Sequence, residues 1–134
     1  TGLYDIYDEP PGSLLLLPLF GLVGVDDPIY QNTVSSITDP AYPYSFSGTP
    51  YSAIGCPHAP HPWTLSLANQ LRVSHDQEAL RKLLEAPMDR EIACESIDEF
   101  TGLAATGDAF ATCAGYLAYV LIEELKYRGT WKIS

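Results

Sequence analysis

The chain has 134 residues, enough for one domain with one modest core, because a chain of this size buries about two thirds of its surface on folding. Its 46% hydrophobic and 18% charged residues are typical of folded proteins. The formal net charge of −10 disfavours nucleic acid and anionic membrane surfaces as partners. Nine tyrosines and two tryptophans suit neutral polar ligands such as sugars, whose C–H faces stack on aromatic rings.

The first predicted elements are two helices. Ser13 can cap a helix over LLLLPLFGL, which is apolar on every side, so we expect a helix buried all round and bent at Pro18. The run is too short and too broken for a membrane span. Asp26 or Asp27 caps a second helix over VDDPIYQNTVSSI, antiparallel to the first, with Pro28 in its first turn. Its apolar face would hold Ile29, Thr33, Val34 and Ile37.

A long loop comes next. From Thr38 to Pro62 the sequence is rich in Pro, Tyr, Ser and Gly, which exclude a regular helix. Long ordered loops of this kind are usually functional. His58 and His61 lack the third ligand of a catalytic zinc site, so we predict no metal. They would hydrogen-bond either a ligand hydroxyl or the carbonyls of their own loop.

Three more helices are expected. TLSLANQLR has helical spacing, and SHDQEALRKLLEA would begin with Ser74 as its cap. A second loop carries a short strand over residues 91–97. AFATCAGYLAYVLIEELKYRG is the last helix and stops at Gly129. The order predicts an all-α fold of paired antiparallel helices with long irregular loops.

One acidic residue stands out for its setting. Glu95 follows an apolar run and precedes a polar loop, where partial burial would perturb its protonation. That setting suits a general acid or base. The alternative is a structural role, in which Glu95 pairs with Arg90 or caps a turn.

The cysteines number three. Cys56, Cys94 and Cys113 lack the spacing of a zinc site or of a disulfide framework, so we expect buried thiols in a reducing compartment. We therefore predict a cytoplasmic protein without a metal or other cofactor.

Four motifs occur in a characteristic order: SLLLLPLFGL, DDPIYQNT, GCPHAPHPW and ACESID. In these motifs the chain resembles the carboxy-terminal third of glycoside hydrolase family 125, the metal-independent exo-acting α-1,6-mannosidases. The resemblance spans residues 8–119. It implies part of an (α/α)6 toroid whose loops build the sugar site at one end. Residues 1–134 would then be a single domain, the C-terminal fragment of a larger catalytic domain.

The resemblance also implies roles for individual residues. Glu95 matches the family's general base, and Asp98 matches an aspartate that follows it and orients neighbouring groups. The family's general acid lies upstream of the first motif. In the family, a segment before the first motif contacts the sugar; Asp8 matches an aspartate of that segment, but this chain lacks its asparagine. The family also has an aromatic-rich segment after the base, where this chain has DAFATCA. Sugar and linkage specificity therefore stay open.

Together these observations predict the C-terminal part of an inverting α-glycosidase, an exo-α-mannosidase acting on terminal α-mannosides with Glu95 as general base. The prolines would hold His58 and Trp63 at the mouth of a sugar pocket, for hydrogen bonding and stacking respectively. Alone, the chain should be inactive. Its exposed apolar helix faces should make it self-associate. The alternatives are a non-catalytic carbohydrate-binding or interaction module and a glucoamylase-like toroid glycosidase.

Overall fold

The computed structural model describes residues 13–86 and 93–130, and within these ranges the chain is mostly helical. Asp8 and the first part of the predicted strand lie outside the described residues. The elements in chain order are a 3-10 helix η1 (Ser13–Leu16), α1 (Pro28–Thr38), α2 (Thr64–Ser74), α3 (Gln77–Glu85), β1 (Ser96–Ile97), β2 (Ala104–Thr106) and α4 (Ala111–Tyr127). The two strands pair antiparallel. None of the described helices combines the length and apolarity needed to cross a bilayer.

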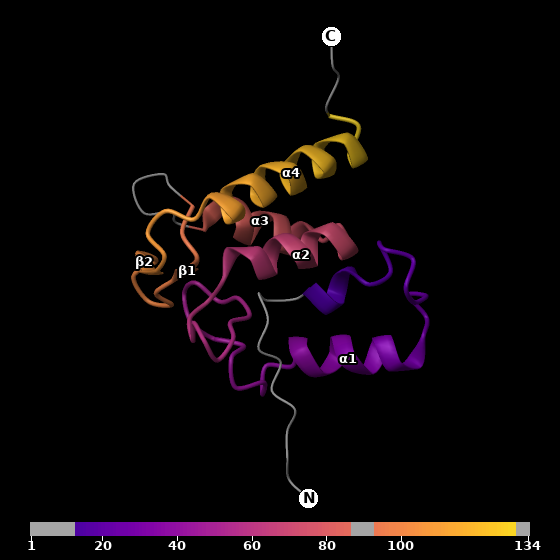
Figure 1. The fold of residues 1–134 in the computed structure, drawn as a ribbon, viewed down its shortest axis with the longest axis horizontal. Coiled ribbons are helices and arrows are strands. Elements are labelled where there is room, and N and C mark those ends of the chain that lie inside the picture. Colours follow the sequence, from indigo (N-terminus) through magenta and orange to yellow (C-terminus); the bar gives the residue numbers. More distant parts are fainter. Residues whose placement is uncertain (1–12, 87–92, 131–134) are drawn as a thin grey trace, which may run out of the picture.

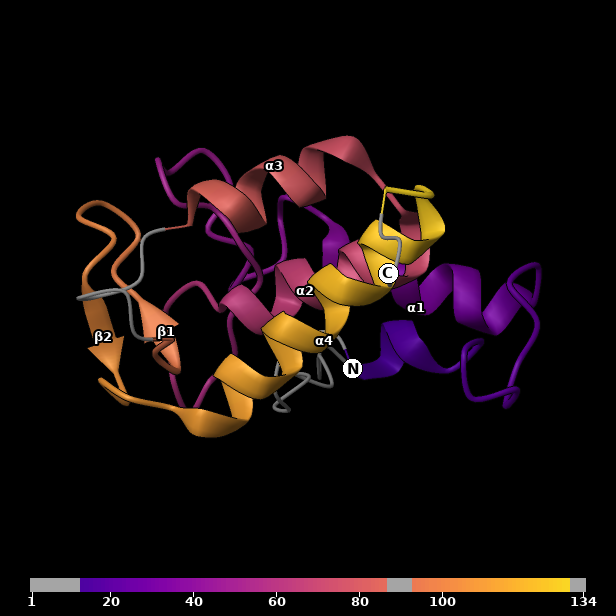
Figure 2. The same ribbon diagram turned by 90° about the horizontal axis from the view of Figure 1, so that it is seen from above.

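Helix α2 is the centre of the fold. It contacts α4, α3 and η1, and Figures 1 and 2 show α4 crossing over it. The predicted apolar positions of α2 are buried, which confirms this helix: they are Leu65, Leu67, Ala68 and Leu71. The core continues into α3 through Leu83 and into α4 through Cys113, Leu117 and Val120. Residues 13–86 and 93–130 contain four α-helices and one small antiparallel sheet, which confirms the expectation of a mostly helical fold, while the (α/α)6 ring remains an expectation from the resemblance.

The first helix was predicted too long. Only Ser13–Leu16 is helical, and turns continue to Gly21, whose φ is +69°. Pro18 cannot donate the backbone bond that an α-helix would need there. Phe20 and Leu22 are 68% and 67% exposed, so the expectation of a helix buried on all sides is wrong.

Helix α1 starts where the sequence predicts. The carboxylate of Asp27 accepts hydrogen bonds from the backbone N–H of Ile29 (2.8 Å) and Tyr30 (3.2 Å), and Pro28 is the first helical residue. The predicted apolar face is confirmed in part: Ile37 is buried and Thr33 and Val34 are partly buried, but Ile29 is exposed. Tyr30, which was not predicted, is buried instead. The Tyr30 hydroxyl donates to the Leu15 carbonyl at 2.9 Å, and burial raises its pKa. This bond ties α1 to η1.

Helix α3 begins two residues later than expected. Ser74 is the last residue of α2, and the carboxylate of Asp76 caps α3 by accepting from the N–H of Ala79 at 2.9 Å. Between the two helices His75 adopts a left-handed conformation with φ of 51°. The two residues His75 and Asp76 therefore connect α2 to α3.

The predicted last helix is confirmed as α4, and it ends at a glycine as expected. Gly129 has φ of +67°, and the N–H groups of Gly129 and Thr130 donate to the carbonyls of Lys126 and Leu125. Glu124, buried in the last turns, bonds His75 at 2.7 Å and Arg128 at 2.6 Å. This ion-pair cluster fastens the end of α4 to the end of α2.

Candidate functional site

Glu95 lies directly before β1. Its N–H is shared between the carbonyls of Thr106 (3.2 Å) and Gly107 (3.0 Å), and its side chain is half-buried. The strand pairing is irregular between Ser96 and Ile97, so the register shifts next to Glu95. Figures 1 and 2 place this hairpin at the end of the molecule where α2 and α4 begin. The Glu95 backbone is thus held against the second strand of the hairpin.

Gly107 leaves room for the Glu95 side chain. Its φ of +55° is one that side-chain-bearing residues rarely adopt. A Cβ atom added at Gly107 would lie 2.8 Å from the Cβ of Glu95 and 3.6 Å from its Oε2. The direction of the Glu95 carboxylate therefore depends on the absence of a side chain at residue 107.

Replacing this glycine tests that dependence. Gly107→Ala should cost about 1–2 kcal/mol for the left-handed backbone and about 1–3 kcal/mol more for overpacking against Glu95. Gly129→Ala is a matched control, because φ is also positive there but an added Cβ meets nothing within 4 Å. Urea unfolding gives both costs, and the amide resonance of Glu95 should move only in Gly107→Ala. Equal costs for the two variants would contradict the role of Gly107.

The proline-rich loop docks on the segment that carries Glu95. The N–H of Ile97 donates to the Pro62 carbonyl at 2.9 Å. His61 Nδ1 lies 3.1 Å from Glu99 Oε2, and both side chains are partly buried. The Tyr51 N–H also donates to the Glu99 carbonyl at 3.2 Å. Loop and hairpin therefore form one structural unit.

Gly55 allows a second close approach within that loop. A Cβ atom at this position would lie 2.3 Å from the His61 carbonyl oxygen and 2.7 Å from the ring of Phe46. The Gly55 N–H donates to the Tyr44 carbonyl at 2.8 Å. The glycine of the GCPH motif thus serves packing between loop segments.

His58 and Trp63 occupy different environments. His58 is exposed, with its ring nitrogens 3.4 and 3.9 Å from Cys56 Sγ. Trp63 is only 1% exposed, and its indole N–H donates to the Ala59 carbonyl at 3.0 Å. The edge of one ring meets the face of the other, at a centroid distance of 5.4 Å. The structure places Trp63 in the core beneath His58 rather than at a pocket mouth, because its large apolar ring packs among the helices.

Asp98 makes a tight turn after β1. Its Oδ1 accepts from the N–H groups of Phe100 (3.1 Å) and Thr101 (2.7 Å) and from the Thr101 hydroxyl (2.8 Å). The hydrogen bonds from Thr101, then from Phe100, hold the pKa of Asp98 below its usual value. The carboxylate stays ionised and shapes the loop that follows Glu95.

Sequence reasoning missed Glu99 as a partner of His61. The two residues are 38 positions apart, so no local pattern could have paired them. The burial expected for the cysteines is confirmed for Cys56, Cys94 and Cys113. Burial also raises the pKa of Cys113, whose Sγ lies 3.3 Å from the Thr64 hydroxyl. Among residues 13–86 and 93–130, no three His, Cys, Asp or Glu side chains come together as a metal-binding group.

Comparison with known proteins identifies relatives of this chain. The family model for metal-independent alpha-mannosidase (GH125) matches residues 4–122. The meiotically up-regulated gene 157 protein of Schizosaccharomyces pombe is 40% identical over 76 residues, which are 54% of this chain and 15% of that protein. The match thus spans about 15% of the length of this curated relative. No solved structure matches the chain.

Proposed function

The chain belongs to the GH125 family of metal-independent α-mannosidases, and we propose that it is the C-terminal part of an inverting exo-α-mannosidase with Glu95 as general base. The family match over residues 4–122 carries this proposal, because it includes all four motifs of the resemblance. The activity belongs to the longer parent protein. In this proposal the parent protein supplies the partner acid, so we expect residues 1–134 alone to be inactive.

The geometry of Glu95 supports the role. In an inverting hydrolase a carboxylate takes a proton from the attacking water, while a carboxylic acid about 6.5–9.5 Å away protonates the leaving oxygen. A base must be fixed in direction and still reach water. Two observations support this role: Thr106 and Gly107 hold the Glu95 backbone, and Glu95 is only partly buried. The general acid comes from the parent protein upstream of the first motif.

The other predicted contacts follow from the placements above. His58 is exposed and supported by Trp63, so we assign it a hydrogen bond to a sugar hydroxyl. Trp63 acts through His58 and through the loop. Asp98 orients the segment after Glu95, and Asp8 is a substrate contact in the proposal.

Proton NMR of the parent protein with an α-linked manno-disaccharide tests this function. We expect β-mannose to appear first and α-mannose only later by mutarotation, because a single displacement inverts the anomeric centre. Initial release of α-mannose would contradict inversion. Sugar resonances that shift while no α-mannoside or α-glucoside is cleaved would favour the carbohydrate-binding module instead. Cleavage of α-glucosides alone would favour the glucoamylase-like alternative.

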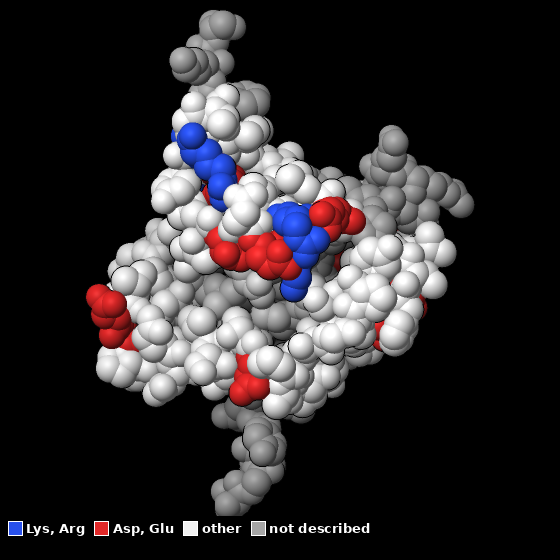
Figure 3. Space-filling model, turned by 180° about the vertical axis from the view of Figure 1, so that it is seen from behind, with Lys and Arg blue, Asp and Glu red and all other residues white. Residues whose placement is uncertain are grey.

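Self-association of the isolated chain is a second expected outcome. Large apolar side chains are exposed on two parts of the described surface: Phe20, Leu22 and Ile29 near α1, and Tyr119, Ile122 and Leu125 on α4. Figure 3 shows charged side chains gathered in a few clusters with wide uncharged areas around them. Exposed apolar patches of this kind bind one another in water. Sedimentation velocity at rising concentration should show growing oligomers, and a monomer throughout would contradict the expectation.

A further inference from the structure

A cavity separate from the Glu95 side chain opens between residues 50–53 and α3. Buried Leu67 of α2 and Ile97 of β1 give it an apolar floor, and its volume is about 100 Å³. One water molecule needs only about 10–15 Å³ of such space, so the cavity can hold several. A pyranose ring would enter by one edge and keep the other edge in solvent. Glu95 is not among the residues that line this cavity.

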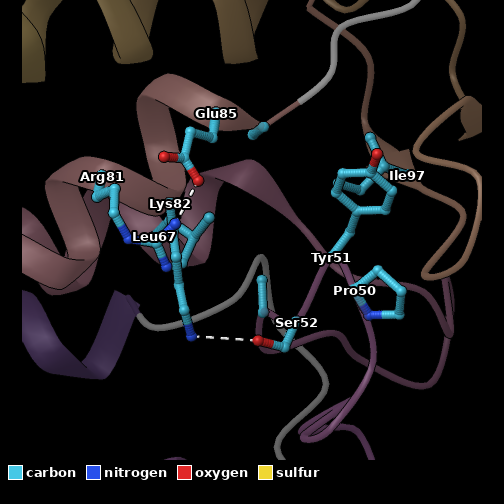
Figure 4. A pocket seen from close by; sticks show the side chains of 10 residues that line it. Pro50, Tyr51, Ser52, Leu67, Arg81, Lys82, Glu85 and Ile97 are labelled. Carbon is cyan, nitrogen blue, oxygen red and sulfur yellow. Dashed lines mark hydrogen bonds and ion pairs between the residues drawn. The ribbon is translucent and has the colours of Figure 1, made fainter.

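The walls of the cavity differ in chemistry. Figure 4 shows the rings of Pro50 and Tyr51 on one side and the polar side chains of α3 on the other. Lys82 reaches from α3 to Ser52, and its Nζ donates to the Ser52 hydroxyl at 3.1 Å. An ammonium group has three N–H donors, so Lys82 can donate two more hydrogen bonds, and the Ser52 hydroxyl can donate one. An aromatic face opposite directed donors suits a sugar ring.

The local charge favours a neutral ligand over an anion. Arg81 forms ion pairs with Glu78 (2.6 Å) and with Glu85, one turn away on either side. Two cations and two carboxylates therefore lie along this face of α3, and their charges balance. The remaining polar groups at the cavity can exchange hydrogen bonds with hydroxyls. Glu85 adds acceptor oxygens at the rim.

We propose that this cavity is a second carbohydrate-binding position, which takes one neutral hexose unit on Tyr51, with its hydroxyl groups bonded to Lys82, Ser52 and Glu85. The ligand class rests on the proposed function, but the site and its chemistry rest on the cavity itself. The position is attached to the segment of Glu95, because Tyr51 bonds the Glu99 backbone and Ile97 lines the floor. The cavity would therefore bind a second sugar unit of the same oligosaccharide, while the unit to be cleaved off lies at Glu95.

Titration of the 134-residue chain with methyl α-mannoside tests this site without any hydrolysis. In ¹⁵N–¹H spectra we expect shifts at the amides of residues 51–53 and 81–85. Tyr51→Ala should raise Kd for this position about 3- to 10-fold, whereas Tyr51→Phe, which keeps the ring, should leave it unchanged. Lys82→Met should raise Kd about 10-fold or more. Lys126→Met is the matched control, because Lys126 pairs with Glu123 on α4 outside the residues that line the cavity.

Three results would overturn the proposal. Shifts confined to residues 95–107 would assign the sugar to Glu95 alone. Shifts with inorganic phosphate but not with the mannoside would make the cavity an anion site. The same Kd for the mannoside in Tyr51→Ala, Lys82→Met and Lys126→Met would contradict the contacts assigned to Tyr51 and Lys82. The parent protein separates this proposal from the catalytic one, since Glu95→Gln should strongly slow hydrolysis yet leave the shifts at residues 51–53 in place.

Discussion

Replacement of Glu95 by Gln in the parent protein should lower kcat for α-mannoside hydrolysis by about 10²- to 10⁴-fold. The amide has the shape of the carboxylate but cannot accept a proton from the attacking water. The two backbone bonds of residue 95 do not involve the side chain and should persist. Substrate affinity should therefore change little, and the loss should appear in kcat.

The control for this experiment is Glu123→Gln. Glu123 lies on α4, where it pairs with Lys126 and Arg72 away from the Glu95 hairpin. This variant removes one carboxylate and should keep full turnover. Steady-state kinetics on both variants, with the unaltered protein beside them, give the comparison. If Glu95→Gln has the same kcat as the wild-type protein, Glu95 is not the general base.

Replacement of Trp63 by Ala should destabilise the 134-residue chain by about 3–5 kcal/mol, because a large buried ring leaves a cavity in the core. The ring is 1% exposed, lies directly before α2, and bonds the Ala59 carbonyl. Natural domains are stable by only about 5–15 kcal/mol, so the loss would be a large fraction of the total. Urea unfolding followed by circular dichroism measures it.

Two further variants keep the Trp63 prediction decisive. Trp63→Phe preserves most of the packing and should fold even where Trp63→Ala does not, at an intermediate cost. Phe100→Ala removes a ring that is 66% exposed and should change stability by less than about 0.5 kcal/mol. A cost of Trp63→Ala as small as that of Phe100→Ala would mean that the ring does not support the core.

Local periodicity predicted the helices that pack on the core. Helix α2 is the clearest case, since Leu65, Leu67 and Leu71 are spaced for burial and are all buried. The same reasoning failed for SLLLLPLFGL, because apolar composition does not report whether a partner covers the segment. Phe20 is hydrophobic and exposed within the described part of the chain.

The candidate site was predictable only in part. The setting of Glu95 and the motif resemblance both pointed to this residue, and its partial burial agrees with the expected setting. The clearance that Gly107 provides depends on a hairpin register and on a positive φ, which no spacing in the sequence expresses. Trp63 shows a further limit, because a tryptophan beside prolines reads equally well as a binding platform or as a core residue. In this structure the Trp63 ring is buried in the core.

The bond from the Ile97 amide to the Pro62 carbonyl has a consequence for hydrogen exchange. Exchange of this amide with solvent requires that the proline-rich loop and the Glu95 hairpin separate, so its rate reports the free energy of that opening. A sugar that binds only the closed arrangement would slow the exchange, even without touching residue 97. The exchange rate of the Ile97 amide can therefore report sugar binding either to the proline-rich loop or to the Glu95 hairpin.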